Sequence, residues 1–206
     1  ANRVIAIRAR TGSGKSTVLP VALFRVLRSS KVPPHVRYRG ASVLCTQPRV
    51  LTAISLAHDV ASRPWNPDMV LDLTVGYVTG PQQRAPMRGL IYATAGVLAV
   101  QLRANDDAAI MDRYRFIVFD EAHERSPDAD FTLMLLRGFY ARHEGNPRLP
   151  FLLLASATFD PFYYARYFGL AAANVFEVTG HTFPPEEFYL DHGANDYYVG
   201  AAPHVK

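Results

Sequence analysis

Short apolar runs, separated by helix-like segments, repeat along most of this chain. The runs are nearly continuously apolar, which is typical of strands covered on both faces of a sheet; they are residues 3–9 (RVIAIRA), 42–46 (SVLCT), 116–119 (FIVF) and 151–156 (FLLLAS). Helix-like segments follow or intervene at about residues 15–29, 49–62, 95–104, 127–140 and 160–168. Strands that alternate with helices predict an α/β fold with a mostly parallel, doubly wound sheet and helices on both faces. Ligands of such sheets bind beyond the carboxyl ends of the strands.

The helix expected at 127–140 has a well-signalled start. Ser126 can accept a hydrogen bond from the first turn, and Pro127 suits the first helical position. The carboxylates of Asp128 and Asp130 favour the positive end of the helix dipole.

The segment ARTGSGKST, residues 9–17, lies between the first expected strand and the first expected helix. Glycines in this position let backbone N–H groups turn towards a phosphate, and the helix N-terminus adds positive potential. We expect Lys15 to reach the β- and γ-phosphates and Ser16 to hold Mg²⁺. Ala9 stands where the full phosphate-loop pattern has glycine, and alanine is tolerated unless the backbone needs a positive φ. The alternative is a glycine-rich turn with an exposed lysine. The expected nucleotide-binding residues are Thr11, Gly12, Ser13, Gly14, Lys15, Ser16 and Thr17.

The segment FIVFDEAHERS, residues 116–126, places two carboxylates directly after an apolar strand. Asp120 is expected to bind Mg²⁺, directly or through water, and Glu121 to position and deprotonate an attacking water. The alternative is a polar loop that caps the next helix. The expected metal ligands are Ser16, Asp120 and Glu121.

Composition narrows the class of protein without naming a function. The chain has 206 residues, enough for one well-packed domain, and a net charge of +4 that tolerates an anionic partner without requiring one. The single cysteine, Cys45, excludes an internal disulfide framework and fits a reducing compartment such as the cytoplasm. No apolar run approaches the length of a membrane span, and the histidines lack zinc-ligand spacing.

Asp-Glu-Ala-His at 120–123 resembles the signature of the DEAH-box branch of the superfamily 2 helicases, and other segments are similar to its motifs in the same order. These are TGSGKSTVLP (11–20) for motif I, TQPRVLTAISLA (46–57) for motif Ia, YATAGVL (92–98) for motif Ib, DEAHERS (120–126) for motif II and SAT (156–158) for motif III. YFG (167–169) and GHTFPPEEFYL (180–190) resemble the segment that closes the first motor domain.

The resemblance covers about residues 5–190. It implies one RecA-like domain over 1–190, with 191–206 a tail or a truncated connection to a second RecA-like domain. Because Ala1 is not an initiator methionine, we expect a piece of a longer protein.

The resemblance implies an ATP-driven, monomeric motor that acts on single-stranded RNA, with DNA as the alternative. ATP and Mg²⁺ would be held between this domain and the second one. His123 would join Lys15, Asp120 and Glu121 as a catalytic residue and link the ATP site to the second domain. Ser156 and Thr158 would couple hydrolysis to strand movement, although each taken alone could simply end a strand. The residues implied along the nucleic-acid path are Gln47, Pro48, Arg49 and Thr94. Such contacts go mainly to phosphates, which makes binding largely independent of sequence.

Several positions depart from the family pattern. Val50 and His181 stand where the family commonly has arginine, and Ala95 replaces an acid in motif Ib. Asp59 aligns with an arginine that stacks on adenine in cellular members, so we expect weak selection of the base. These departures favour a divergent viral or bacterial relative, with the host cytoplasm as the location of a viral protein.

Two other functions remain as alternatives. One is a P-loop NTPase that switches partners without unwinding, and the other is a nucleic-acid-binding module with inactive nucleotide chemistry. The aromatic segment FYYARYF at 162–168 could stack nucleobases, but a helix that packs its aromatic residues into the core is the favoured interpretation.

Overall fold

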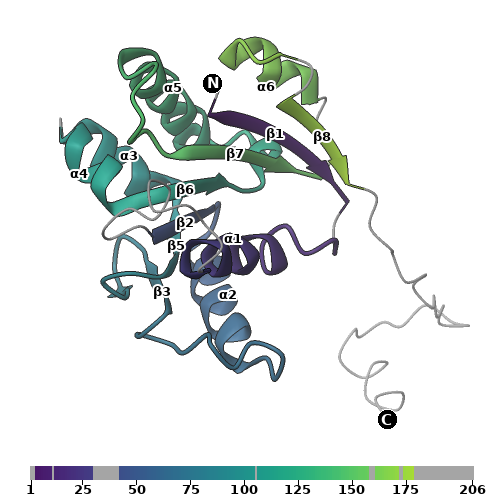
Figure 1. Ribbon diagram of the computed structural model, residues 1–206, viewed down its shortest axis with the longest axis vertical. Helices are drawn as coiled ribbons and strands as arrows, with labels where there is room; N and C mark the ends of the chain where they lie inside the picture. Colours follow the sequence, from purple (N-terminus) through teal and green to yellow (C-terminus); the bar gives the residue numbers. More distant parts are fainter. Residues whose placement is uncertain are drawn as a thin grey trace, which may run out of the picture.

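One mixed sheet organises the computed structural model of the chain, which describes residues 3–10, 12–29, 42–104, 106–157, 161–171 and 174–178. The strands are β1 (Val4–Ala9), β2 (Ser42–Gln47), β3 (Val75–Val78), β4 (Gln83–Arg84), β5 (Leu90–Thr94), β6 (Tyr114–Phe119), β7 (Phe151–Ser156) and β8 (Val175–Val178). Their order across the sheet is β4-β3-β5-β2-β6-β7-β1-β8, and every neighbouring pair is parallel except β3 with β4 (Figure 1).

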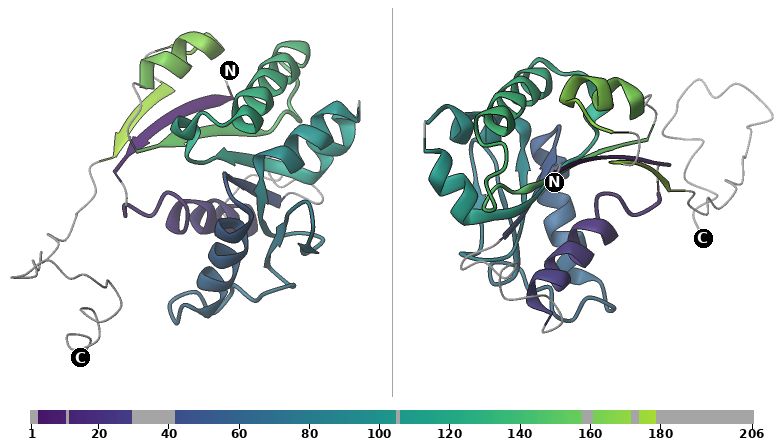
Figure 2. Two further views of the ribbon diagram at one scale, coloured as in Figure 1. Left: turned by 180° about the vertical axis from the view of Figure 1, so that it is seen from behind. Right: turned by 45° about the horizontal axis from the view of Figure 1, so that its top comes forward.

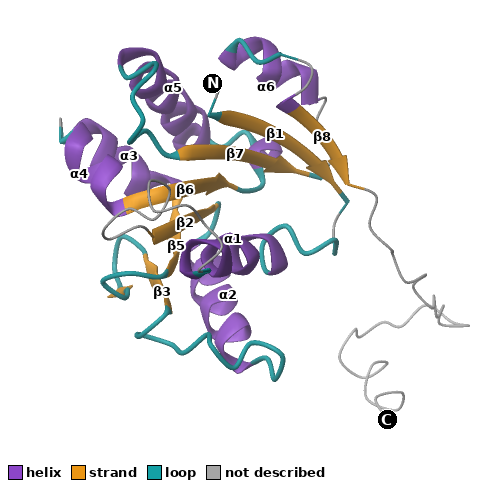
Figure 3. Cartoon of the chain, viewed as in Figure 1, coloured by secondary structure: helices purple, strands orange, loops and turns teal. Residues whose placement is uncertain are grey.

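Helices cover both faces of this sheet. They are α1 (Val18–Arg28), α2 (Val50–Ser62), α3 (Ala95–Arg103), α4 (Asp107–Arg113), α5 (Pro127–Arg142) and α6 (Pro161–Phe168), with a 3₁₀ turn, η1, at Ala122–Glu124. One hydrophobic core joins α1 and α2 to one face of the sheet, and a second core joins α3, α4, α5 and α6 to the other. Figures 2 and 3 show the two helical layers with the strands between them. The predicted doubly wound, mostly parallel α/β fold is confirmed.

The predicted helices occur with shifted ends. The first helix begins at Val18 rather than at residue 15, because the N–H groups of Thr17, Val18 and Leu19 all turn onto the carbonyl oxygen of Gly14. The helix expected at 127 begins there, and the Ser126 hydroxyl accepts a hydrogen bond from the Ala129 N–H at 3.2 Å. That cap is the one predicted.

Among the described residues, β3, β4, β5, β8, α4 and the η1 turn were not predicted. The strands among them are short, and β3 contains Gly76, which weakens a strand pattern. A side chain there would collide with the chain opposite, since a Cβ on Gly76 would lie 2.0 Å from the Arg84 carbonyl oxygen. Glycine is therefore required by a contact between strands, which local sequence does not reveal.

The parallel register gathers several carboxyl ends at one edge of the sheet. Gln47 at the end of β2 pairs with Thr94 at the end of β5, and Arg8 near the end of β1 pairs with Ser156 at the end of β7. Thr11, Thr158, 180–190 and 191–206 lie outside the described residues, so the predictions for them stay predictions. Among the helices described, none has the length and apolar character of a membrane span.

Candidate functional site

The loop between β1 and α1 has the backbone that a phosphate loop needs. Gly12 and Gly14 have φ of +80° and +88°, a region that residues with a side chain rarely adopt. A Cβ on Gly14 would also lie 2.8 Å from Cγ2 of Val18, so the first turn of α1 leaves no room there. Ala9 ends β1 and is not among the residues with positive φ, which explains why alanine is accepted at this departure from the pattern.

Lys15 and Ser13 present polar groups inside this loop. Lys15 is only 6% exposed, and its ammonium donates to the carbonyl oxygen of Arg10 at 3.0 Å. The Ser13 hydroxyl is buried and has no hydrogen-bond partner among the described residues. A buried hydroxyl without a partner is uncommon, and an incoming phosphate oxygen would satisfy it.

Asp120 follows β6 and is the hydrogen-bonding centre of the site. It is 3% exposed, and its Oδ2 accepts from the Ser16 hydroxyl at 2.5 Å and from the Gln47 amide at 3.0 Å. Its Oδ1 accepts from the Glu121 N–H at 2.9 Å. The structure therefore joins the phosphate loop, motif Ia and motif II on one buried carboxylate.

Glu121 and His123 extend this centre towards β7. Burial raises the pKa of the Glu121 carboxyl, and the charge of Asp120 raises it further, against the opposing effect of Lys15. Oε2 of Glu121 lies 3.2 Å from Nδ1 of His123, which in turn lies 2.9 Å from Oγ of Ser156. Glu121 has φ +51° and the nearby Arg125 has φ +48°, so both sit in the left-handed region. The turn brings together Asp120, Glu121 and His123, three of the four residues predicted to be catalytic.

Tyr92 is a residue of this site that the sequence analysis missed. It lies fully buried on β5, and its hydroxyl donates to the Ser16 carbonyl oxygen at 2.7 Å. Burial raises the pKa of this phenol well above its usual value, so it stays a neutral donor. A buried tyrosine hydroxyl in a strand signals that a partner exists, but only the folded sheet shows that the partner is the phosphate loop.

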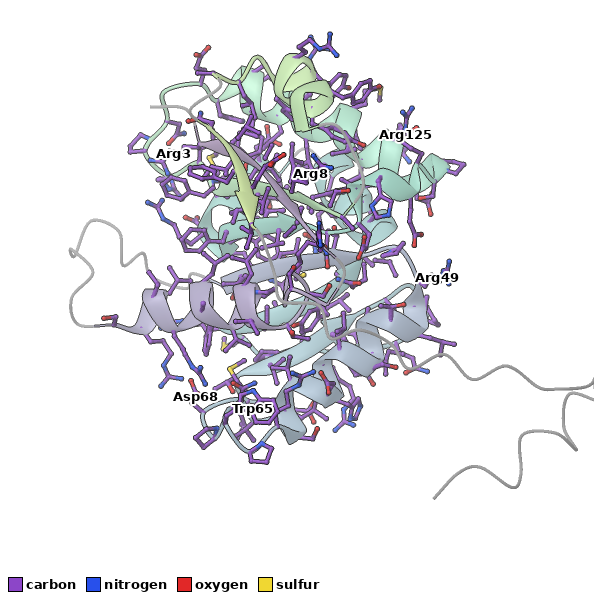
Figure 4. The ribbon with its side chains drawn as sticks, turned by 90° about the vertical axis from the view of Figure 1, so that its right-hand side faces the viewer. Arg3, Arg8, Arg49, Trp65, Asp68 and Arg125 are labelled. Atoms are coloured by element: carbon purple, nitrogen blue, oxygen red, sulfur yellow. The ribbon has the colours of Figure 1, made fainter. Side chains whose placement is uncertain are left out.

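The residues predicted along the nucleic-acid path fall into two groups. The Arg49 side chain is 76% exposed, with Nη2 3.9 Å from Oε1 of Glu124, and Thr94 is half-buried at the start of α3. Pro48 is also partly exposed, whereas Gln47 is 2% exposed and holds Asp120. Figure 4 shows Arg49 and Arg125 on the same side of the molecule.

Asp59, which stands at the expected base-stacking position, forms an ion pair with Arg63, the residue that follows helix α2. Its Oδ2 accepts from Nε and Nη2 of Arg63 at 2.9 and 2.6 Å. The Arg63 guanidinium lies 5.4 Å from the centre of the Trp65 ring. The Arg63 guanidinium is thus held between the Asp59 carboxylate and the Trp65 indole.

The residues present fit a magnesium ion bound together with phosphates. Among the described residues, no group of three or more histidine, cysteine or acidic side chains is arranged to hold a metal by itself. Mg²⁺ is usually held by one or two carboxylates, waters and substrate phosphates, and the adjacent oxygens of Ser16 and Asp120 suit that arrangement.

Comparison with known proteins identifies the family. Residues 1–164 match the DEAD/DEAH box helicase family. The chain is 46% identical over 202 residues to the protein named "Putative RNA Helicase B962L" of African swine fever virus, covering 96% of this chain and 21% of that protein. It is 35% identical to the ATP-dependent RNA helicase TDRD9 of Danio rerio and 32% identical to the DExH-box ATP-dependent RNA helicase DExH2 of Arabidopsis thaliana, covering 92% of this chain in both cases. The chain spans 14% and 11% of those two relatives.

These matches agree with the motifs quoted from the sequence, and the expected viral or divergent character fits the viral relative. The mostly parallel α/β fold agrees with the motor domain of such a helicase. The chain belongs to the DEAD/DEAH box helicase family, as an N-terminal RecA-like motor domain.

Proposed function

We propose that this domain binds Mg²⁺-ATP and single-stranded RNA at the carboxyl edge of its sheet, and that it drives RNA unwinding together with a second RecA-like domain of the parent chain. One observation carries the proposal: Asp120 accepts hydrogen bonds from both Ser16 and Gln47. Ser16 belongs to the phosphate loop and Gln47 to the strand that leads to Arg49. In this proposal, one buried carboxylate therefore links the nucleotide site to the strand that leads to the RNA contacts.

Each residue of the cluster has a defined task in this proposal. Lys15 leaves the Arg10 carbonyl oxygen to bind the β- and γ-phosphates, and the Ser13 hydroxyl donates to a phosphate oxygen. Ser16 and Asp120 would hold Mg²⁺, which would supply positive charge next to the phosphates. Glu121 accepts a proton from the attacking water, a role for which a carboxylate of raised pKa is suited.

Two connections support coupling between the nucleotide and RNA. Gln47 connects Asp120 to the residues before Arg49, and Tyr92 connects the phosphate loop to β5, which ends at Thr94. A change at the phosphates is thereby transmitted to both expected RNA contacts. His123 and Ser156 connect the same centre to β7 and, in our proposal, to the second domain.

We further propose that the motor is monomeric and works in the cytoplasm, where Cys45 would stay reduced, or in the host cytoplasm for a viral protein.

The domain alone should hydrolyse ATP very slowly. An arginine finger contributes about 10³ to 10⁵ to the rate of phosphoryl transfer, and in the resembling helicases this group comes from the second domain. Arg125 is the arginine that follows Glu121 most closely, but Asp130 holds its guanidinium at 2.9 Å. In this position Arg125 stabilises the turn rather than contacting the γ-phosphate.

The experiment compares the 206-residue chain with the complete parent protein. We expect the short chain to bind ATP and, in a salt-sensitive way, single-stranded RNA, but to show little turnover and no unwinding. The complete protein should show RNA-stimulated turnover and unwinding. Turnover without unwinding would indicate a partner switch, and robust turnover by the short chain would show that the catalytic charge lies within it.

A further inference from the structure

Two adjoining hollows lie along α5 and α6. The first, of about 400 Å³, has a described lining of Arg137, Tyr163, Arg166 and Tyr167. The second, of about 190 Å³, is lined by Arg125, Asp130, Leu133, Tyr163, Tyr164 and Tyr167. Because both hollows share Tyr163 and Tyr167, they form one depression, which we call the α5–α6 groove.

The spacing along α6 decides which aromatic residues face this groove. Tyr164 borders the second hollow, but it is only 3% exposed and its hydroxyl donates to the Ala122 carbonyl oxygen at 2.6 Å, so its ring is packed in the core. Tyr163, Arg166 and Tyr167 stand three and four positions apart and share another side of the helix. The aromatic segment expected to pack into the core is therefore divided, and part of it lines a surface.

Arginines stack on the tyrosines that line the groove. The Arg125 guanidinium lies 5.6 Å from the centre of the Tyr163 ring, and that of Arg137 lies 4.7 Å from the centre of the Tyr167 ring. Tyr163 is 46% exposed. Asp130 is ion-paired with Arg125, so Arg137 and Arg166 supply the positive charge that remains in the lining. Aromatic faces combined with guanidinium groups are the chemistry that holds single-stranded nucleic acid without reading its sequence.

The groove is continuous with the expected RNA contacts. Arg49 lies 3.9 Å from Glu124, which directly precedes Arg125 in the turn after motif II. Arg125 then reaches the Tyr163 ring, and Figure 4 places Arg49 and Arg125 on one side of the molecule. A single strand of RNA that extends from Arg49 along this side would next reach the α5–α6 groove.

We propose that the α5–α6 groove binds single-stranded RNA beyond the Arg49 and Thr94 contacts. Bases stack on Tyr163 and Tyr167, and phosphates contact Arg137 and Arg166. The proposal rests on the proposed function, since it extends the same RNA path. An acidic protein segment would use the arginines, but it would leave the exposed face of Tyr163 without a stacking partner.

Fluorescence anisotropy with the complete protein and labelled oligouridylates of two lengths tests the proposal. The short probe, of about 5 nucleotides, fills the Arg49 contacts only, and the long probe, of about 16, reaches the groove. Tyr163→Ala should weaken binding of the long probe by about fivefold or more, because stacking of a base is lost, and leave the short probe unaffected. Tyr163→Phe should restore the affinity, and Arg166→Glu should reduce the salt dependence of the long probe by about 0.7 in slope.

Two variants elsewhere serve as matched controls. Trp65→Ala removes another exposed aromatic residue stacked with an arginine, and Arg28→Glu reverses the charge of another exposed arginine on a helix. Neither should alter binding of either probe. Thermal melting of each variant shows that it is folded, and Arg166→Glu answers the question if Tyr163→Ala does not fold.

The outcomes separate this proposal from the proposed function. If the wild-type protein binds neither probe, the proposed function fails. If Arg49→Ala weakens both probes while Tyr163→Ala and Arg166→Glu change neither, the groove proposal alone is overturned. Crosslinking of photoreactive uridine to the peptide that contains Tyr163, seen only with the long probe, would support it.

Discussion

The nucleotide edge of the sheet and the α5–α6 groove are built by different means. At the edge, Lys15, Asp120 and Ser156 lie at strand ends or in the loop after a strand, and each is less than 10% exposed. In the groove, Tyr163 and Arg166 project from one turn of a helix and are exposed. Side chains at the edge are fixed by hydrogen bonds, whereas Tyr163 and Tyr167 in the groove stack with Arg125 and Arg137, a contact that tolerates small shifts. The edge therefore suits chemistry that requires one geometry, and the groove, if it binds RNA as proposed, suits contact with a strand that moves.

The strictest test of this contrast is an isosteric change at the edge. In the complete protein, Glu121→Gln should lower the rate of ATP hydrolysis by about 10²- to 10⁴-fold while nucleotide binding persists, because an amide cannot accept the proton. Steady-state turnover and nucleotide titration measure the two effects. Glu144→Gln, which changes an exposed acid just after α5, is the control. If Glu121→Gln retained full turnover, the base would lie elsewhere.

Removing the buried ammonium is the next largest change. Lys15→Ala should weaken binding of Mg²⁺-ATP by about 10-fold or more, since a hydrogen bond to a charged phosphate is worth about 1.5–3 kcal/mol. Titration with a fluorescent nucleotide checks this, and chelation of Mg²⁺ should weaken the wild-type protein in the same assay. Arg28→Ala, on the exposed side of α1, is the matched control. Equal affinities for wild type and Lys15→Ala would contradict the assignment of the loop.

We expect weak selection of the nucleotide base, in contrast to the tight binding expected for the phosphates. Asp59 cannot form a cation–π contact with a base, and it holds Arg63 in an ion pair. We expect competition assays to show less than about a hundredfold preference for ATP over the other nucleoside triphosphates, and we expect Asp59→Arg to increase that preference. A wild-type preference beyond that limit would place another stacking group at the base.

The smallest expected effect concerns the hydroxyl that supports the phosphate loop from β5. Tyr92→Phe should weaken nucleotide binding by only a few-fold, because a neutral hydrogen bond contributes about 0.5–1.5 kcal/mol. The same variant should reduce the stimulation of ATP turnover by RNA if β5 transmits the signal. Tyr77→Phe, on the neighbouring strand, controls for loss of a hydroxyl. Unchanged stimulation would limit Tyr92 to a structural role.

The sequence predicted the parts of the site in which neighbouring residues carry the chemistry. The strings GSGKS and DEAH sit directly after strands, so their place at the edge followed once the strands were recognised. The link from Tyr92 to Ser16 joins residues 76 positions apart, and the inward position of Gln47 depends on Asp120, 73 positions away. Such contacts arise from the order of the strands across the sheet, which brings residues distant in the sequence together. The groove could not be predicted for the same reason. The contact between α5 and α6 depends on the position of β7 between β6 and β1 in the sheet.

The left-handed backbone at Glu121 and Arg125 has a consequence for how this domain can evolve. A residue with a side chain in that region is disfavoured by about 1–2 kcal/mol, and glycine would relieve the strain. Glycine at 121 would also delete the carboxylate that we propose as the general base, so on that proposal a change that relieves strain at this position would remove activity. Selection must hold an unfavourable residue in place, and the rest of the domain must supply a stability reserve large enough to absorb it.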